Sequence, residues 1–293
     1  MPTRRLFCFG LGYCARVLAA RLRAEGWRIA GTVRGADEAA RLSASGIEAF
    51  VFAPGAPLAG PRDALAGTTH LLSSIPPEAS GDSVIARHGA DIAACRELAW
   101  VGYLSTTGVY GDRGGGWVDE ETRPMPSGAR GQRRVAAEEA WRELGRGHGI
   151  PIHVFRLAGI YGPGRNALVD VRAGTARRVH KPGQVFGRIH VDDIAAVLAA
   201  SMAHPRPGSI YNVCDDLPAP PDQVVSYACE LLGVAPPPLV PFDSAGLSPM
   251  ARSFYRDNKR VSNRRIKDEL GVRLAYPDYR AGLKALLEGG VAT

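Results

Sequence analysis

The stretch Arg4–Ala15, RRLFCFGLGYCA, decides the fold of this chain. It predicts a short apolar strand, a glycine turn and a helix, with the small residues at G-x-G-x-x-A spacing. Gly10 permits the tight turn, Gly12 lets backbone approach a pyrophosphate, and Ala15 allows close helix–strand packing. The alternative is an ordinary strand–turn–helix corner, but this context favours a dinucleotide cradle. The residues of the predicted cradle are Gly10, Leu11, Gly12, Tyr13, Cys14 and Ala15.

The composition limits the class of protein. The 293 residues are 45% hydrophobic and 22% charged, which is ordinary for a soluble globular protein. The net charge of +7 comes mostly from arginine, without a basic run interleaved with aromatic residues, so we expect no nucleic-acid partner. The five cysteines lack metal-ligand spacing, which predicts no metal site and a reduced, cytoplasmic protein. No apolar run approaches the roughly 18 residues of a membrane span, and we expect no signal peptide or membrane partner.

Strand-like runs alternate with helical patterns through the first two hundred residues. This alternation predicts an α/β fold with a doubly wound parallel sheet, the Rossmann fold. After the first strand, the expected strands are Arg28–Val33, Glu48–Phe52, Thr69–Ile75, Trp100–Ser105, Ile152–Leu157 and Ser209–Val213. The expected helices include Ala36–Ser45, Val135–Leu144, Pro221–Leu232, Arg264–Leu270, Tyr279–Leu287, and His190–Met202 with Asp192 or Asp193 as its N-cap.

The alternation breaks after Ile160, where glycine–proline turns replace it. We therefore expect a Rossmann domain formed by residues 1–160 plus 188–215. Residues 161–187 plus 216–293 are expected to form a small C-terminal substrate lobe. Within the lobe, the proline-rich segment Val234–Pro249 predicts a long irregular connection.

Several later segments carry a family resemblance. They are Leu104–Asp112 (LSTTGVYGD), Phe155–Gly164 (FRLAGIYGPG), His190–Ala195 (HVDDIA) and Tyr211–Val213 (YNV). In this order they resemble the extended short-chain dehydrogenase/reductase superfamily, specifically its NAD-dependent epimerase/dehydratase group. The resemblance implies a Rossmann fold, an NAD(P) cofactor, and oxidoreductase or epimerase activity on a small, anionic or nucleotide-sugar substrate.

The chain departs from the family pattern at the expected catalytic pair. The family's Tyr-x-x-x-Lys positions fall on Arg130 and Arg134, whereas Thr106 matches the family's Ser/Thr that hydrogen-bonds the reacting oxygen. Arg130 cannot shuttle a proton, because a guanidinium keeps its charge to a pKa above ~12, but it can hold a carboxylate or phosphate. Arg134 can reach a ribose or phosphate. The alternative for both arginines is a solvated basic helix start.

The cofactor positions follow from the resemblance. The end of the second strand, which selects the cofactor in the family, has no acidic residue before Asp37. Arg34 stands there instead and favours NADP, with NAD as the alternative cofactor and a surface arginine as the alternative role. Ser73, Ser74 and Ile75 end the fourth strand and are expected to lie along the ribose and pyrophosphate.

Other polar residues carry structural expectations. The matches of Tyr110 and Tyr161 elsewhere in the family are mostly packing residues, and His190 is expected to be structural. The acidic segment Asp119–Glu121 is expected to be a solvated turn.

Two hypotheses for the function stay open. The first is an NAD(P)-binding oxidoreductase or epimerase-like enzyme, favoured by the retained Thr106. The second is a non-catalytic NADP-binding sensor or assembly module, favoured by the lost Tyr-x-x-x-Lys pair. The family also predicts a homodimer through Val84–Leu98 and Arg134–Leu144, although these helix faces can equally be intramolecular core.

Overall fold

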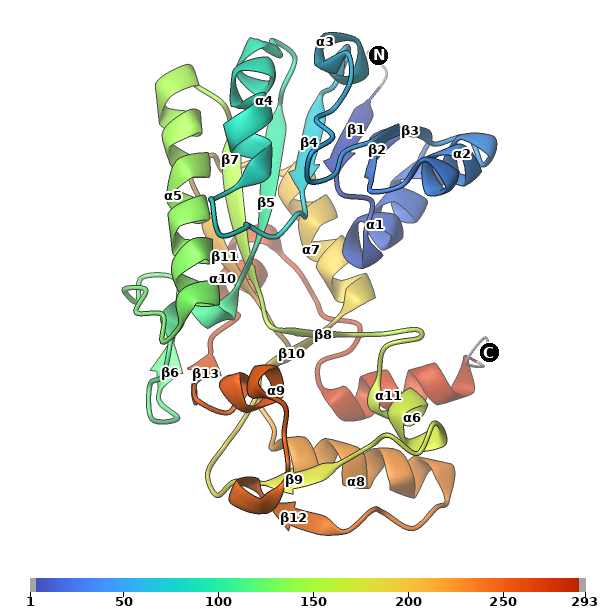
Figure 1. The fold of residues 1–293 in the computed structure, drawn as a ribbon, viewed down its shortest axis with the longest axis vertical. Coiled ribbons are helices and arrows are strands. Elements are labelled where there is room, and N and C mark those ends of the chain that lie inside the picture. Colours follow the sequence, from blue (N-terminus) through green and yellow to red (C-terminus); the bar gives the residue numbers. More distant parts are fainter. Residues whose placement is uncertain (1–3, 290–293) are drawn as a thin grey trace. The chain divides into compact units, whose positions relative to one another are not determined.

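A computed structural model describes residues 4–289 as an α/β protein. Its central sheet has seven parallel strands in the order β11-β7-β5-β4-β1-β2-β3 (Figure 1). They are β1 (Arg5–Phe9), β2 (Arg28–Val33), β3 (Glu48–Val51), β4 (His70–Ser73), β5 (Trp100–Thr106), β7 (Ile152–Leu157) and β11 (Ile210–Val213). The chain builds outward from β1 to β3 and then returns to the other side of β1 with β4. This reversal is that of a doubly wound sheet, and the predicted Rossmann fold is confirmed.

Helices connect these parallel strands. They are α1 (Tyr13–Ala24), α2 (Ala36–Ala44), α3 (Pro61–Leu65), α4 (Ser83–Ala94), α5 (Ala129–His148) and α7 (Val191–Ala203). Helix α5 extends beyond the predicted Val135–Leu144 at both ends; at its N-terminal end, arginine and glutamine favour a helix without adding to an apolar face. The predicted N-cap of α7 is wrong, because Asp192 and Asp193 already lie in its first turn.

The chain divides into two compact units. Unit 1 comprises Met1–Thr106, Gln132–Arg156 and Ile194–Tyr211, and unit 2 comprises Thr107–Gly131, Leu157–Asp193 and Asn212–Thr293. The expected division into a Rossmann domain and a substrate lobe stays a prediction.

The core of unit 1 forms around strands that are buried on both faces. All five residues of β1 are buried, and Phe7 packs edge-on against Phe9 with ring centroids 5.0 Å apart. The same core cluster takes in the helix faces considered above for a dimer, through Ile85, Ile92, Ala137 and Leu144. In the structure these four side chains therefore pack inside unit 1, and the homodimer stays a prediction.

Unit 2 contains short parallel strand pairs and helices. The pairs are β8 (Gly159–Tyr161) with β10 (Arg188–His190), β9 (Arg178–His180) with β12 (Leu239–Pro241), and β6 (Trp117–Val118) with β13 (Arg260–Val261). Its other helices are η1 (Thr107–Tyr110), α6 (Ala167–Arg172), α8 (Pro221–Leu232), η2 (Phe242–Ser244), α9 (Pro249–Phe254), α10 (Arg264–Leu270) and α11 (Tyr279–Glu288). The proline-rich segment is more regular than predicted, because it supplies both β12 and η2.

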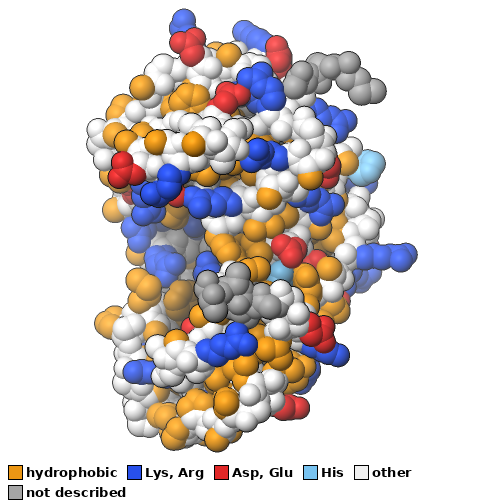
Figure 2. Space-filling model, turned by 90° about the vertical axis from the view of Figure 1, so that its right-hand side faces the viewer, with side chains coloured by type: hydrophobic (Ala, Val, Ile, Leu, Met, Phe, Trp, Pro, Cys, Tyr) orange, Lys and Arg blue, Asp and Glu red, His pale blue; other side chains and the backbone are white. Residues whose placement is uncertain are grey.

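The surface mixes both signs of charge. On the face in Figure 2, arginine and lysine side chains are scattered among acidic and hydrophobic ones. Among the helices of residues 4–289, none has the length and apolar character that a membrane span requires.

Candidate functional site

The glycine loop lies between β1 and α1 in unit 1. Gly10 has a φ of 90°, a conformation that L-residues with a side chain rarely adopt. A Cβ at Gly10 would also lie 2.8 Å from Ser74 Oγ. Both facts require glycine at this position, as the motif predicts.

The ends of two neighbouring strands hold the loop in place. Thr32, near the end of β2, accepts the Gly10 N–H with its hydroxyl at 2.9 Å and the Leu11 N–H with its carbonyl at 2.8 Å. Ser74, after β4, donates its hydroxyl to the Gly10 carbonyl at 2.7 Å. Sequence reasoning missed Thr32, although a fully buried threonine in an otherwise apolar strand is a signal for such a contact.

The fit of a pyrophosphate to the loop depends on the space and the N–H groups at Gly12. It is the N-cap of α1, no side chain caps the helix there, and an added Cβ would have no atom within 4 Å. A helix N-terminus with open space in front attracts anions through its N–H groups and dipole. Leu11, Cys14 and Ala15 are buried behind the loop. The open, uncapped helix start at Gly12 therefore fits the pyrophosphate of a dinucleotide.

The remaining predicted cofactor residues follow neighbouring strands of the same sheet. Arg34 comes directly after β2 and is exposed. Ser73 ends β4 with a buried hydroxyl that has no partner among the described residues. Ile75 packs against the core of unit 1. Since carboxyl ends of parallel strands share one edge of a sheet, Arg34 and the glycine loop lie at that edge.

Arg134 is held by the backbone of β5. Its Nη1 donates to the Leu104 carbonyl at 2.7 Å and to the Tyr103 hydroxyl at 3.2 Å, and its guanidinium lies 5.8 Å from the centre of the Tyr103 ring. Burial raises the pKa of the Tyr103 phenol, so this tyrosine is no substitute proton donor. Thr106 ends the same strand and is half-buried.

Arg130 lies in the first turn of α5 and belongs to unit 2. Its guanidinium lies over the ring of Phe254, 5.3 Å from the ring centre, and Phe254 is 54% exposed. Sequence reasoning missed Phe254, which is 124 residues away along the chain, because nothing in the local pattern links the two positions.

The side chains of Tyr110, Tyr161 and His190 all make structural contacts. The Tyr110 hydroxyl donates to Asn212 Oδ1 at 2.7 Å, and the Tyr161 hydroxyl donates to the Asp278 carbonyl at 3.3 Å. Burial raises the pKa of the Tyr161 phenol. His190 is buried, and its Nδ1 accepts the Asp192 N–H at 3.2 Å. These roles agree with the sequence expectation.

The acidic turn is only partly as predicted. Asp119 and Glu121 are exposed, but Glu120 is half-buried and its carboxylate accepts the Asn212 N–H at 2.7 Å. Burial raises the pKa of the Glu120 carboxyl. The expected solvated turn is therefore wrong at Glu120, because its carboxylate accepts a backbone N–H of strand β11.

Comparisons with known proteins place these features in a family context. Residues 91–214 match the model of the NAD dependent epimerase/dehydratase family. A functionally unknown conserved protein from Silicibacter pomeroyi DSS is 54% identical, with a TM-score of 0.91 over 99% of this chain and 100% of that one. The predicted family resemblance is confirmed.

Two further relatives extend the comparison. Protein YeeZ from Escherichia coli strain K12 is 29% identical over 289 residues, covering 94% of this chain and 97% of YeeZ. UDP-glucuronic acid 4-epimerase from Bacillus cereus, solved in complex with UDP-glucuronic acid and NAD, is 14% identical with a TM-score of 0.77. That similarity covers 96% of this chain and 97% of the epimerase, and it is one of fold.

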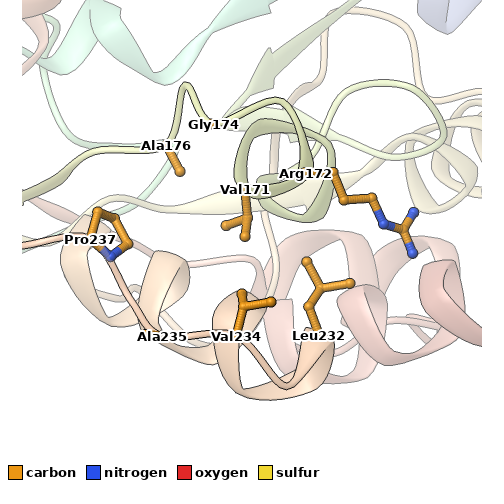
Figure 3. A pocket seen from close by; sticks show the side chains of 8 residues that line it. All are labelled: Val171, Arg172, Gly174, Ala176, Leu232, Val234, Ala235 and Pro237. Carbon is orange, nitrogen blue, oxygen red and sulfur yellow. The ribbon is translucent and has the colours of Figure 1, made fainter.

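Unit 2 contains a cavity whose described lining includes none of the predicted site residues. It has a volume of about 570 Å³ and lies between the end of α6 and the segment that follows α8 (Figure 3). Val171, Leu232 and Val234 point into it, whereas the guanidinium of Arg172 extends to one side. The described residues of its lining are mostly apolar, with Arg172 as the charged one.

Proposed function

We propose that this protein is an NADP(H)-binding, epimerase-like oxidoreductase of the cytoplasm. The single observation that carries the proposal is the glycine loop, with Gly10 in a left-handed turn and Gly12 open at the start of α1. Arg34, exposed after β2, supports the choice of NADP, because a guanidinium matches the 2′-phosphate that NAD lacks.

The proposed substrate is a small molecule with a carbonyl group, an anionic one or a nucleotide sugar. A bound nicotinamide would supply or accept hydride. Thr106 would donate its hydroxyl to the reacting oxygen, and Arg130 would hold an anionic group of the substrate. Neither group exchanges a proton near neutral pH, and general acid–base help is typically worth ~10²–10⁴ in rate. Ordinary ketones should therefore react slowly.

One observation favours the second candidate, a non-catalytic NADP-binding module. Arg134 uses its Nη1 on the Leu104 carbonyl and the Tyr103 hydroxyl. It is thus tied to β5 at the position where the family has its lysine. This arrangement supports a chain that kept the dinucleotide cradle and lost the proton relay.

Calorimetric titration with NADP and NAD tests the proposal. We expect tighter binding of NADP, and Arg34→Asp should weaken NADP far more than NAD. Gly12→Val should stay folded, since a side chain there has open space, but should lose both dinucleotides. A folded Gly12→Val protein with unchanged affinity would show that the cofactor binds elsewhere.

Turnover separates the two candidates. NADPH oxidation should be measured with carbonyl compounds that carry a carboxylate or phosphate, in the wild type, in Thr106→Ala and in Arg130→Tyr/Arg134→Lys. Turnover that falls in Thr106→Ala supports the enzyme. Tight NADP binding without turnover of any substrate, in the wild type and in the double variant, supports the module.

A further inference from the structure

Arg16 links the glycine loop to the start of α2. It lies in the first turn of α1, four residues after Gly12. Its Nε donates to the Leu11 carbonyl at 2.8 Å, and its Nη2 donates to the Glu38 carboxylate. Glu38 lies in the first turn of α2, four residues after Arg34. All these residues belong to unit 1.

This ion pair lies where the fold leads us to expect the adenosine ribose of a bound dinucleotide. In a doubly wound fold, a dinucleotide on the glycine loop places that ribose at the carboxyl end of β2. Arg16 and Glu38 join the loop to the helix that follows β2. A 2′-phosphate bound by Arg34 would therefore enter the neighbourhood of a second guanidinium and of a carboxylate.

The energetics allow the phosphate to displace the carboxylate. The side chains of Arg16 and Glu38 are 48% and 37% exposed. An ion pair that is exposed to this degree is weak, because water competes for both charges. A phosphate dianion offers more charge and accepts two parallel N–H bonds from a guanidinium. The bond from Nε to the Leu11 carbonyl keeps Arg16 in place even when Glu38 is removed.

We infer that Arg16 is a second residue that selects NADP(H) over NAD(H), and that Glu38 competes with the 2′-phosphate for its guanidinium. The inference rests on the proposed function. Glu38 thereby weakens NADP binding and leaves NAD binding unchanged, because NAD has no group that exchanges with the carboxylate. Arg34 sets the preference for the phosphate, and the Arg16–Glu38 pair sets how strong that preference is.

Arg21 supplies a matched control. It lies on the same helix and pairs with Glu25 at 3.7 Å, and both side chains are about half exposed. Dissociation constants should be measured by calorimetry for NADP, NAD, adenosine 2′,5′-bisphosphate and AMP. The variants are Arg16→Gln, Arg16→Lys, Glu38→Gln and Arg21→Gln.

We expect Arg16→Gln to weaken NADP and the bisphosphate about 10-fold, the effect of one charge-assisted hydrogen-bonded contact, while NAD and AMP change less than ~2-fold. Glu38→Gln should tighten NADP and the bisphosphate about 3-fold or more. Arg16→Lys should fall between the wild type and Arg16→Gln, because lysine keeps the charge and loses the fork. Arg21→Gln should match the wild type.

The outcomes separate this inference from the function it rests on. A wild type that binds neither dinucleotide overturns both. A wild type that prefers NADP, and loses that preference in Arg34→Asp, upholds the NADP binding on which the inference rests. If Arg16→Gln and Glu38→Gln then behave like Arg21→Gln with all four ligands, only the inference is overturned. Should Arg16→Gln fail to fold, Glu38→Gln and Arg16→Lys give the same decision.

Discussion

The interactions that stabilise unit 1 differ in kind from those that stabilise unit 2. In unit 1, parallel strands with buried residues alternate with helices, and backbone bonds join neighbouring strands. In unit 2, polar side chains bond to backbone far away along the chain. Asp193 accepts two N–H groups from residues 275 and 276, and Lys259 donates to the Gly111 carbonyl at 2.9 Å. The strands of unit 1 follow from local sequence patterns, whereas unit 2 adds polar contacts between distant residues to its own hydrophobic cluster.

A buried ion pair in unit 1 is the contact whose loss should lower stability most. Glu138 on α5 and Arg156 on β7 are 4% and 2% exposed. Arg156 donates its Nε to Glu138 at 3.1 Å and its Nη2 at 2.8 Å, and the Ser105 hydroxyl also donates to Glu138. Glu138→Leu would remove the carboxylate that pairs with this buried guanidinium. We expect the free energy of unfolding to fall by about 3–5 kcal/mol in urea titration.

The neighbouring residue Glu139 is the control. It also has two arginine partners, Arg142 and Arg146, but its side chain is 46% exposed. Glu139→Leu should cost no more than ~1 kcal/mol. If the two variants lose a similar free energy of unfolding, burial does not explain the contribution of the Glu138 ion pair to stability.

The distance along the chain between contacting residues decides which features of the structure could be predicted from the sequence. Strands Arg28–Val33 and Ile152–Leu157 were predicted with their observed bounds, because hydrophobic runs ended by turns are local signals. The glycine loop was predicted for the same reason. Thr32 and Phe254 were not, because their roles depend on partners 22 and 124 residues away. Glu120 was misjudged because its buried donor lies 92 residues further along the chain.

Acid should destabilise unit 1 through His153. This histidine is fully buried, its Nε2 accepts the Arg206 N–H at 3.0 Å, and burial lowers its pKa to about 4. The pKa of an unfolded histidine is about 6.5, so the stability from the neutral ring is complete above that pH. It is lost as the pH falls from about 6.5 towards 4. The expected loss is roughly 3 kcal/mol, measured by urea unfolding across this range.

His153→Gln should flatten this pH dependence. Glutamine can accept the Arg206 N–H and donate to the Val101 carbonyl, which lies 3.3 Å from His153 Nδ1, but it does not titrate. A residual slope should remain from buried His70, whose pKa is also lowered to about 4. Exposed His204 is the control, and His204→Gln should keep the wild-type profile. A profile unchanged in His153→Gln would contradict the assignment.

In unit 2, the carboxylate of Asp193 should contribute about 2 kcal/mol to the free energy of unfolding. Asp193 is 1% exposed and accepts the Ala275 N–H at 2.8 Å and the Tyr276 N–H at 3.0 Å. Asp193→Ala leaves both donors without a partner, which should lower the free energy of unfolding by about 2 kcal/mol. Asp193→Asn keeps one acceptor and should lose about half as much.

Adjacent Asp192 provides the comparison. Its side chain is 51% exposed and lies 3.6 Å from His190. Asp192→Ala should therefore change the stability by less than ~1 kcal/mol. Equal losses at the two positions would mean that long-range backbone contacts do not hold unit 2 together.

The smallest effect concerns Arg130 and Phe254. A cation above an exposed aromatic ring is worth about 0.5–1 kcal/mol, so a double-mutant cycle with Arg130→Ala and Phe254→Ala should give a coupling energy in that range. A weak coupling would leave the guanidinium of Arg130 available to a substrate anion. A coupling above ~2 kcal/mol would instead make Arg130 a structural part of unit 2, as Glu138 is of unit 1, and would remove it from the proposed anion site.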